Sequence, residues 1–196
     1  MKEHVLSLSY GKDSLACLGA IEKLGWPLDR IVHAEIWATD TIPADLPPMV
    51  EFKARADEII KTRWGITVEH FTTKYAEGIS GEKVNYEECF YRRMVKGKFV
   101  GRMKGFPMQK GNWCTKLKLN AIAQLGITED TIQYIGIAQD EPERLARLDG
   151  VTKLSPLAAI GWTEIDCRRW CEENNLLSPI YTTATRGGVG FATIRV

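Results

Sequence analysis

The residues best suited to chemistry lie near the start of the chain, in the segment Ser9–Ser14 with the sequence SYGKDS. Lys12 provides a mobile positive charge, the two serines provide hydroxyl donors, and Gly11 allows the backbone to approach a ligand closely. Asp13 either caps a helix or helps to place a metal ion. A helix that begins near Ser14 would point its free N–H groups and the positive end of its dipole at an anion. The segment is therefore a candidate phosphate-binding loop.

The loop alone does not distinguish an anion site from a structural turn. An ordinary turn between a strand and a helix also favours glycine, aspartate and serine. The segment matches neither the Walker motif G-x-x-x-x-G-K-[ST] nor the dinucleotide-binding motif G-x-G-x-x-G. The surrounding sequence must therefore decide between the two interpretations.

Strand-like and helix-like patterns alternate along the first part of the chain. Their β-α-β-α-β order predicts an α/β fold with a mostly parallel sheet flanked by helices and with right-handed crossovers. In such a sheet the ligand crevice lies beyond the carboxyl ends of the strands, where the Ser9–Ser14 loop falls. The predicted strands are 4–9, 31–37 and 66–72, and the predicted helices are 14–24 and 47–64.

The second half of the chain predicts further elements after an irregular segment. Residues 74–112 are rich in lysine, arginine, glycine and aromatic residues, and we interpret them as an insertion or lid with a short helix at 86–95. Thr163 and Asp166 match the start of a helix with an acidic partner at its third position, which predicts a helix at 164–174. The remaining predicted elements are a helix at 114–125 and a strand at 131–137, all within a single domain over residues 1–196.

Composition sets the broad class of protein. The chain has 196 residues, of which 44% are hydrophobic and 26% charged, and its formal net charge is +1. These values indicate a soluble globular protein and argue against one that is basic throughout, although a local basic patch is compatible with them. No apolar run approaches the ~18 residues of a membrane span. The five cysteines lack regular spacing, which is typical of reduced thiols in a cytoplasmic protein.

The segment SYGKDS resembles the S-G-G-x-D-S pyrophosphate loop (PP-loop) of ATP pyrophosphatases and sulfonucleotide reductases, with Tyr10 in place of the usual first glycine. Three later segments, 38–52, 134–148 and 154–191, resemble motifs of the same family in the same order. The chain therefore resembles the phosphoadenosine phosphosulfate (PAPS) reductase-like family. This resemblance implies the adenine nucleotide α-hydrolase-like fold.

The resemblance also implies a nucleotide site. Asp40 follows the second strand, where the family binds adenine and ribose, and its alternative role is that of a turn residue. Asp140, Glu141 and Arg144 follow the fourth strand, where acidic residues could hold Mg²⁺ and an arginine could bind phosphate or sulfate; a solvated charged loop is the alternative. The catalytic candidates are Lys12, Asp13 and Cys114, the metal candidates are Asp13 and Asp140, and the nucleotide-binding candidates are Ser9, Tyr10, Gly11, Lys12, Asp13, Ser14, Asp40, Lys116, Lys118, Arg144 and Arg186.

A further segment, GNWCTKLKLNAI at 111–122, resembles the W-C-T-x-x-L-K segment of a branch that includes DNA-phosphorothioation enzymes. Lys116 and Lys118 would supply charge for phosphate, and lysines beside Cys114 would lower the pKa of its thiol and make it more reactive. A helix start with a buried cysteine and two solvated lysines is the alternative. Cys167 and Cys171 lie four residues apart on a predicted helix, and we interpret them as core residues.

Two departures from the family limit the expected redox chemistry. Relatives with an iron–sulfur cluster carry the motif R-x-G-C-x-x-C near this position, where this chain has Val189 and Ala192. A four-cysteine cluster needs four placed thiolates, so we expect no iron–sulfur cluster. The cysteine-containing ending E-C-G-L-H of thioredoxin-coupled PAPS reductases is also missing. The histidines show no ligand spacing and are assigned no chemistry; they are His4, His33 and His70.

The resemblance implies an enzyme that uses Mg²⁺ to cleave ATP between the α and β phosphates and adenylylates an acceptor before sulfur or nitrogen transfer. One alternative is a reductase of PAPS or its relative APS with Cys114 as the nucleophile. The other is a nucleotide-binding module that acts within a complex without turnover. The sequence does not identify the acceptor. The basic stretch within 91–104 is a candidate contact for a nucleic acid or a partner protein, and a solvated lid is its alternative.

Overall fold

The computed structural model describes residues 2–39, 41–72, 86–105 and 130–182. These residues divide into two compact units. The first unit contains residues 2–33, 48–70 and 130–182, and the second contains 34–39, 41–47, 71–72 and 86–105. The single domain with an insertion that the sequence suggests stays a prediction.

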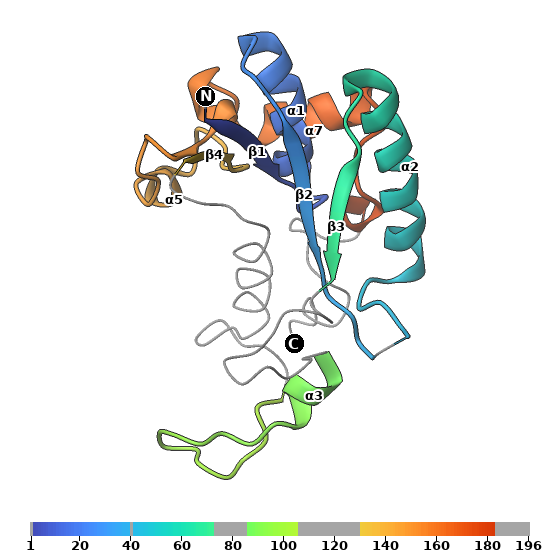
Figure 1. Ribbon diagram of the computed structural model, residues 1–196, viewed down its shortest axis with the longest axis vertical. Coiled ribbons are helices and arrows are strands. Elements are labelled where there is room, and N and C mark those ends of the chain that lie inside the picture. The colour runs from blue at the N-terminus through green and yellow to red at the C-terminus, as the bar shows by residue number, and fades with distance from the viewer. Residues whose placement is uncertain (1, 40, 73–85, 106–129, 183–196) are drawn as a thin grey trace. The chain divides into compact units, whose positions relative to one another are not determined.

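A five-stranded parallel sheet with the strand order β3-β2-β1-β4-β5 organises the fold (Figure 1). In its central strand, Leu6 pairs with Ile31 on one side and with Tyr134 on the other. Because β1 is flanked on both sides, the loop that follows it emerges at the middle of the carboxyl edge, where α/β sheets bind ligands. The strands are β1 (Glu3–Ser7), β2 (Arg30–Glu35), β3 (Val68–Thr72), β4 (Thr131–Tyr134) and β5 (Lys153–Leu154). The predicted α/β class is confirmed.

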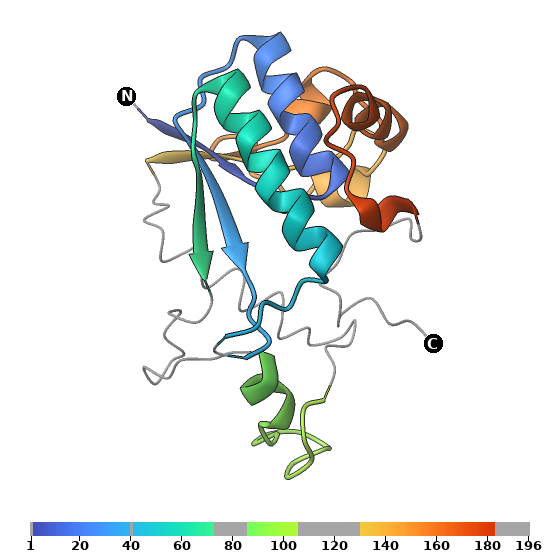
Figure 2. The same cartoon turned by 90° about the vertical axis from the view of Figure 1, so that its right-hand side faces the viewer.

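Helices α1 (Lys12–Leu24) and α2 (Pro47–Trp64) lie side by side on one face of the sheet (Figure 2). α1 also packs against α6 (Pro156–Ala159) and α7 (Glu164–Glu173). The sequence correctly predicts the start of α7, because the Thr163 side chain accepts a hydrogen bond from the Asp166 backbone and the Asp166 side chain accepts one in return. The start of α1, at Lys12, lies within the Ser9–Ser14 loop.

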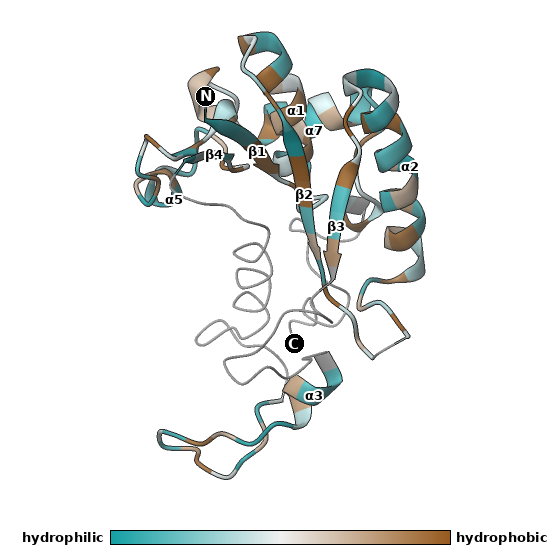
Figure 3. Ribbon diagram, viewed as in Figure 1, coloured by the Kyte–Doolittle hydropathy of each residue, from teal (hydrophilic) through white to brown (hydrophobic). Residues whose placement is uncertain are grey.

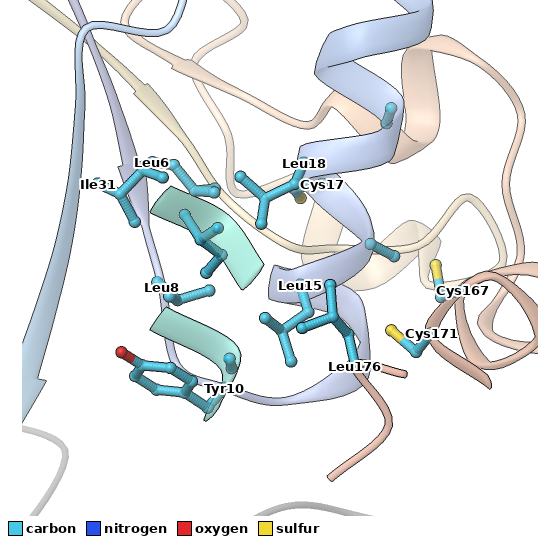
Figure 4. Packing of buried hydrophobic residues seen from close by; sticks show 14 of the residues in the cluster. Leu6, Leu8, Tyr10, Leu15, Cys17, Leu18, Ile31, Cys167, Cys171 and Leu176 are labelled. Carbon is cyan, nitrogen blue, oxygen red and sulfur yellow. The ribbon is translucent and has the colours of Figure 1, made fainter. Parts of the chain in front are cut away.

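The core lies between the sheet and α1 (Figure 4). Leu6 of β1, Ile31 of β2 and Leu15 of α1 are fully buried members of it. Hydrophobic residues continue along the middle of β2 (Figure 3), as expected for a parallel strand covered by helices. Removal of this apolar surface from water anchors the strand and the helix that the loop connects.

The second unit contains α3 (Tyr86–Tyr91) and an antiparallel hairpin that follows it. The N–H of Met94 donates to the carbonyl of Arg102 at 2.9 Å. The predicted helix at 86–95 is therefore too long: it ends at Tyr91, because the next residues pair across the hairpin.

The other described elements are short and were not predicted: α5 (Pro142–Leu145), α6, β5 and the 3-10 helix η2 (Pro179–Thr182). The predicted strand at 131–137 ends at Tyr134. The predicted helix at 114–125 lies outside the described residues. Within the described ranges, no helix combines the length and the apolar character that a membrane crossing requires.

Candidate nucleotide-binding site

The Ser9–Ser14 loop joins β1 to α1 and is closed by its own hydrogen bonds. The N–H of Ser9 donates to Ser14 Oγ at 3.1 Å, and Ser14 Oγ donates to the carbonyl of Gly11 at 3.0 Å. The two serine hydroxyls lie 2.9 Å apart. α1 then begins at Lys12, and its N-cap residue, Gly11, has no side chain to cap it. A loop of fixed shape thus presents the start of a helix, which favours an anion.

Elements from far along the chain hold the start of α1. The N–H of Lys12 donates to the hydroxyl of Tyr181 in η2 at 3.1 Å. The carbonyl of Lys12 accepts a hydrogen bond from Cys171 Sγ of α7 at 3.2 Å. After β4, a Cβ atom on Gly136 would lie only 2.6 Å from the backbone nitrogen of Ser14. Glycine is therefore required at that position for the strand end to approach the loop.

Lys12 carries the positive charge of the loop and is largely buried. Its side chain is 8% exposed, and its Nζ lies 2.6 Å from Asp13 Oδ1 and 3.4 Å from Glu164 Oε1. Burial alone would lower the pKa of Lys12, but the hydrogen bond and the charge of Asp13, together with smaller contributions from Glu164 and Tyr181, outweigh burial and raise it. Lys12 is therefore a fixed, protonated cation at the start of α1.

Three carboxylates meet beside Lys12. Asp13, Glu141 and Glu164 each offer an oxygen, and these oxygens lie within 4.8 Å of one another. Burial raises the pKa of Asp13, and the charges of Glu164 and Glu141 add to this effect against the opposing influence of Lys12. Carboxylate oxygens in such an arrangement suit Mg²⁺, which would relieve their repulsion. Glu164 is not among the residues predicted from the sequence, because only the packing of α7 against α1 brings it to the loop.

Asp140 and Arg144 both have protein partners in this structure. Asp140 Oδ1 accepts a hydrogen bond from the N–H of Glu164 at 3.1 Å, which supports the start of α7. Arg144 Nη1 lies 2.6 Å from each carboxylate oxygen of Glu141. Both side chains thus adjoin the three carboxylates, while the metal role of Asp140 and the phosphate role of Arg144 stay predictions.

Tyr10 stands where the resemblance expects glycine. Its backbone is left-handed with φ 56°, its side chain is fully buried, and its hydroxyl points away from α1 (Figure 4). The hydroxyl donates to Asp57 of α2 and lies 3.1 Å from His70 Nε2. His70 Nε2 in turn lies 2.8 Å from Asp57 Oδ2. The Tyr10 side chain therefore anchors the loop to α2 and β3.

A second pair of residues extends these contacts. His33 Nδ1 lies 2.8 Å from the carbonyl oxygen of Leu8, and His33 Nε2 lies 2.9 Å from Lys53 Nζ. His33 therefore links the backbone before Tyr10 to Lys53 of α2. Lys53 Nζ also lies 5.3 Å from the centroid of the Tyr10 ring. We call Tyr10, His33, Lys53, Asp57 and His70 the tyrosine network.

The tyrosine network is not predicted by the sequence, in which its two histidines carry no assigned chemistry. His33 and His70 lie on neighbouring strands, and their ring centroids are 5.4 Å apart. No local spacing reveals such a pair, because the sheet order creates the proximity. The available signal was a histidine within each of two predicted strands.

Three cysteines pack where α1 meets α7 (Figure 4). Burial raises the pKa of Cys17 and Cys167 well above the ordinary thiol value, and it raises the pKa of Cys171 to about 12. All three are therefore protonated core residues, as the sequence analysis predicted for Cys167 and Cys171.

The described residues thus bring together the Ser9–Ser14 loop, Asp140 and Arg144, and they add Glu164 and Tyr181. The other predicted site residues lie outside the described part of the chain: Asp40, Cys114, Lys116, Lys118 and Arg186.

No protein-family model and no curated protein matches this chain. Among solved structures, the U34-tRNA thiolase NcsA from Methanococcus maripaludis, with its 4Fe-4S cluster, resembles it with a TM-score of 0.54 at 16% sequence identity. The match covers 97% of this chain and 63% of the NcsA chain, so this chain spans less than two thirds of that neighbour. The likeness confirms the predicted adenine nucleotide α-hydrolase-like fold. It does not confirm the PAPS reductase-like family.

The expectation of no iron–sulfur cluster is contradicted, because NcsA carries a 4Fe-4S cluster on this fold. That expectation rested on the absence of cysteine at Val189 and Ala192 and on the four thiolates that a four-cysteine cluster needs. The described cysteines are all buried: Cys17, Cys167 and Cys171 lie where α1 meets α7, and Cys89 lies in α3. Cys114 lies outside the described residues, and no reaction step of this chain is assigned to a cluster.

Proposed function

We propose that this chain is a PP-loop enzyme that cleaves ATP between the α and β phosphates and adenylylates an oxygen atom of an acceptor. The observation that carries the proposal is the Ser9–Ser14 loop, which presents the start of α1, without a side-chain cap from Gly11, and the buried Lys12 at the carboxyl edge of the sheet. The resemblance of SYGKDS to the PP-loop and the fold shared with a thiolase support the same function.

The proposed reaction balances without a protein nucleophile. An acceptor oxygen attacks the α phosphorus, the bond from that phosphorus to the bridging oxygen breaks, and pyrophosphate leaves with the electron pair. A sulfur or nitrogen nucleophile then attacks the activated carbon of the acceptor, and AMP departs with the original oxygen. The protein accelerates these steps by positioning the reactants and stabilising the departing charge.

The residues of the loop have distinct roles in this scheme. The N–H groups at the start of α1 and the ammonium group of Lys12 bind the phosphates that leave as pyrophosphate. The hydroxyl of Tyr181 holds the backbone of Lys12 in position. Asp13, Glu141 and Glu164 would hold Mg²⁺, which supplies neutralising charge for the phosphates when bound.

NcsA is a U34-tRNA thiolase, which supports sulfur transfer to a nucleic-acid base as the overall reaction. In that case the acceptor oxygen belongs to a base carbonyl, and sulfur replaces it. The reductase alternative depends on Cys114, and no described residue favours it. A nucleotide-binding module without turnover would share the loop but release no product.

Product analysis tests this function. The purified chain is incubated with Mg²⁺, bulk cellular RNA, sulfide as the nucleophile and ATP labelled at the α phosphate, and released pyrophosphate is assayed separately. The expected products are AMP and pyrophosphate, and Asp13→Ala abolishes them. Glu58→Ala, on the exposed surface of α2, is the matched control and retains activity.

Other outcomes identify the alternatives. Formation of ADP and phosphate contradicts cleavage between the α and β phosphates. ATP binding without any product favours the non-catalytic module. Sulfite release from PAPS in the presence of thioredoxin, lost in Cys114→Ser, favours the reductase.

A further inference from the structure

Residues 91–104, which we call the basic hairpin, concentrate positive charge. The whole chain has a net charge of only +1, yet this segment contains six lysine or arginine residues and no acidic residue. Five of the six cationic residues are exposed, and Lys104 is half-buried. They are Arg92, Arg93, Lys96, Lys98, Arg102 and Lys104.

Backbone hydrogen bonds hold together the hairpin that carries these cations. The N–H of Lys104 donates to the carbonyl of Arg92 at 2.9 Å, and the N–H of Met94 donates to the carbonyl of Arg102 at 2.9 Å. A third bond, from the N–H of Gly101 to the carbonyl of Met94 at 2.8 Å, closes the hairpin toward its tip. A preformed array of charges loses less conformational entropy on binding than a disordered one.

Aromatic side chains are exposed between the cations. Tyr91 is 58% exposed and Phe99 is 48% exposed. The charged groups of Lys98 and Arg102 lie 6.0 Å and 5.5 Å from the centroid of the Phe99 ring. Hydrophilic and hydrophobic residues alternate along the segment (Figure 3). Cations beside exposed rings are suited to single-stranded nucleic acid, because the cations contact phosphates and the rings stack on bases.

We propose that the basic hairpin binds an unpaired segment of RNA, with its phosphates on the lysine and arginine side chains and its bases on Tyr91 and Phe99. This inference rests on the proposed function, since it names RNA as the class of acceptor whose base oxygen is activated. An unpaired segment is required because bases inside a duplex offer no free faces for stacking. The cations without neighbouring acidic residues are suited to the repeated phosphates of a nucleic acid.

Fluorescence anisotropy of the full chain with a labelled 12-nucleotide single-stranded RNA tests this proposal. Phe99→Ala is expected to weaken RNA binding about tenfold through the loss of one stacking contact. Lys98→Gln is expected to weaken it and to reduce its dependence on salt, and Lys98→Arg to restore both. Lys61→Gln, on the exposed surface of α2, is the matched control and leaves binding unchanged.

Several results would overturn the assignment. One is an RNA affinity that is unchanged in Phe99→Ala although the variant has a native circular dichroism spectrum. The others are tighter binding to duplex RNA or to phosphatidylserine vesicles than to single-stranded RNA, and equal affinity for single-stranded DNA and single-stranded RNA. The two proposals fail separately. If the hairpin variants do not change RNA affinity while the chain still forms AMP from ATP, only the hairpin assignment is overturned. If the chain binds RNA but does not cleave ATP, the proposed function is overturned.

The tyrosine network carries a second, independent inference. A left-handed backbone is unfavourable for a bulky residue and readily adopted by glycine, yet Tyr10 has φ 56°. Its hydroxyl bonds to Asp57, and its ring meets the ring of His33 edge-on at 4.7 Å. His33 also bonds to the carbonyl of Leu8, two residues before Tyr10. Side-chain contacts therefore hold a conformation that the backbone alone does not favour.

We infer that Tyr10 is a positioning residue that sets the backbone of the Ser9–Ser14 loop for phosphate binding. Its removal would release the loop from α2 and β3, and the N–H groups at the start of α1 would lose their fixed direction. If the Tyr10 ring only fills the core, loss of its hydroxyl would not change the affinity of the loop for a nucleotide.

Isothermal titration with ATP and Mg²⁺ separates these roles. In the positioning role, Tyr10→Phe and Asp57→Asn weaken ATP binding several-fold, and Tyr10→Gly binds ATP more tightly than Tyr10→Ala, because glycine adopts the left-handed backbone freely. If the ring only fills the core, Tyr10→Phe binds like the unmodified chain and Tyr10→Gly is the weaker of the two small variants. That result overturns the inference, and a chain that binds no ATP at all overturns the proposed function as well.

Discussion

The Ser9–Ser14 loop and the basic hairpin both present positive charge, but they are built in opposite ways. Lys12 of the loop is 8% exposed and lies beside Asp13 and Glu164. Lys96 and Lys98 of the basic hairpin are exposed, in a segment without acidic residues. A buried, paired cation has one position, and salt screens its interactions little. Salt at 0.1 M largely screens the interactions of exposed cations with charges more than about 10 Å away.

This difference separates two kinds of phosphate recognition. A fixed cation at the start of a helix suits a single group of defined geometry, such as a departing pyrophosphate. An exposed array suits a polymer whose phosphates repeat along its length and whose binding releases counterions. The proposed enzyme needs both, one for the nucleotide and one for the acceptor.

The largest expected effect comes from removing the buried cation. Lys12→Met is expected to reduce kcat/KM for AMP formation by about 100- to 1,000-fold, since a fixed charge at the leaving group is lost. Lys61→Met, on the exposed surface of α2, is the matched control and changes it little. Steady-state kinetics with labelled ATP measure both variants. Equal rates for the two would break the distinction between fixed and exposed cations.

Salt is expected to act unequally on the two regions. A rise in KCl from about 50 to about 200 mM weakens RNA binding about 50-fold if the hairpin contacts about four phosphates. ATP binding at the partly buried loop weakens much less over the same range. Titrations of both ligands at each salt concentration provide the comparison. Equal salt dependence would show that the burial of Lys12 does not distinguish the sites.

A glycine substitution tests the packing that supports the loop. Gly136→Ala places a Cβ atom 2.6 Å from the backbone nitrogen of Ser14. Overpacking of this kind is expected to lower the free energy of unfolding by about 1–3 kcal/mol and to weaken ATP binding. Gly101→Ala in the hairpin meets no atom within 4 Å, though its φ of +83° adds strain, and it should leave ATP binding unchanged. Urea denaturation and ATP titration measure both variants, and unaltered ATP binding in Gly136→Ala would contradict the account.

The smallest expected effect is a pH-dependent stabilisation by Mg²⁺ alone. Burial raises the pKa of Asp13, so the stability from its protonated form is lost as pH rises through that pKa. Mg²⁺ binds the ionised carboxylate and offsets this loss, so it should raise Tm by about 2–4 °C at pH 8 and by less at pH 5. Thermal melts compare the chain with Glu164→Gln, in which the shift should disappear. A larger shift at pH 5 would argue against the carboxylate site.

Local signals predicted much of the fold. The alternation of strands and helices gave the parallel α/β class, and the pair Thr163 and Asp166 marked the start of α7. The loop was located for the same reason, because its polar residues directly follow a strand. Such features depend on neighbouring residues and on the general handedness of strand connections.

The rest of the candidate site depends on contacts between distant segments. Glu164 reaches the loop through the packing of α7, and His33 approaches His70 through the order of the strands. Tyr10 was expected among the nucleotide-binding residues, yet its side chain is directed into the tyrosine network. The hairpin was partly predicted as a helix, because its cross-strand bonds leave no periodic pattern in a short charged segment.

The central claim is that the Ser9–Ser14 loop binds the phosphates that leave as pyrophosphate. A crystal structure of the full chain with Mg²⁺ and α,β-methylene-ATP, which cannot be cleaved at that bond, tests it most directly. The account predicts the β and γ phosphates within hydrogen-bonding distance of the N–H groups at the start of α1 and of Lys12 Nζ. A nucleotide bound elsewhere, or one whose adenine occupies the loop, would contradict it.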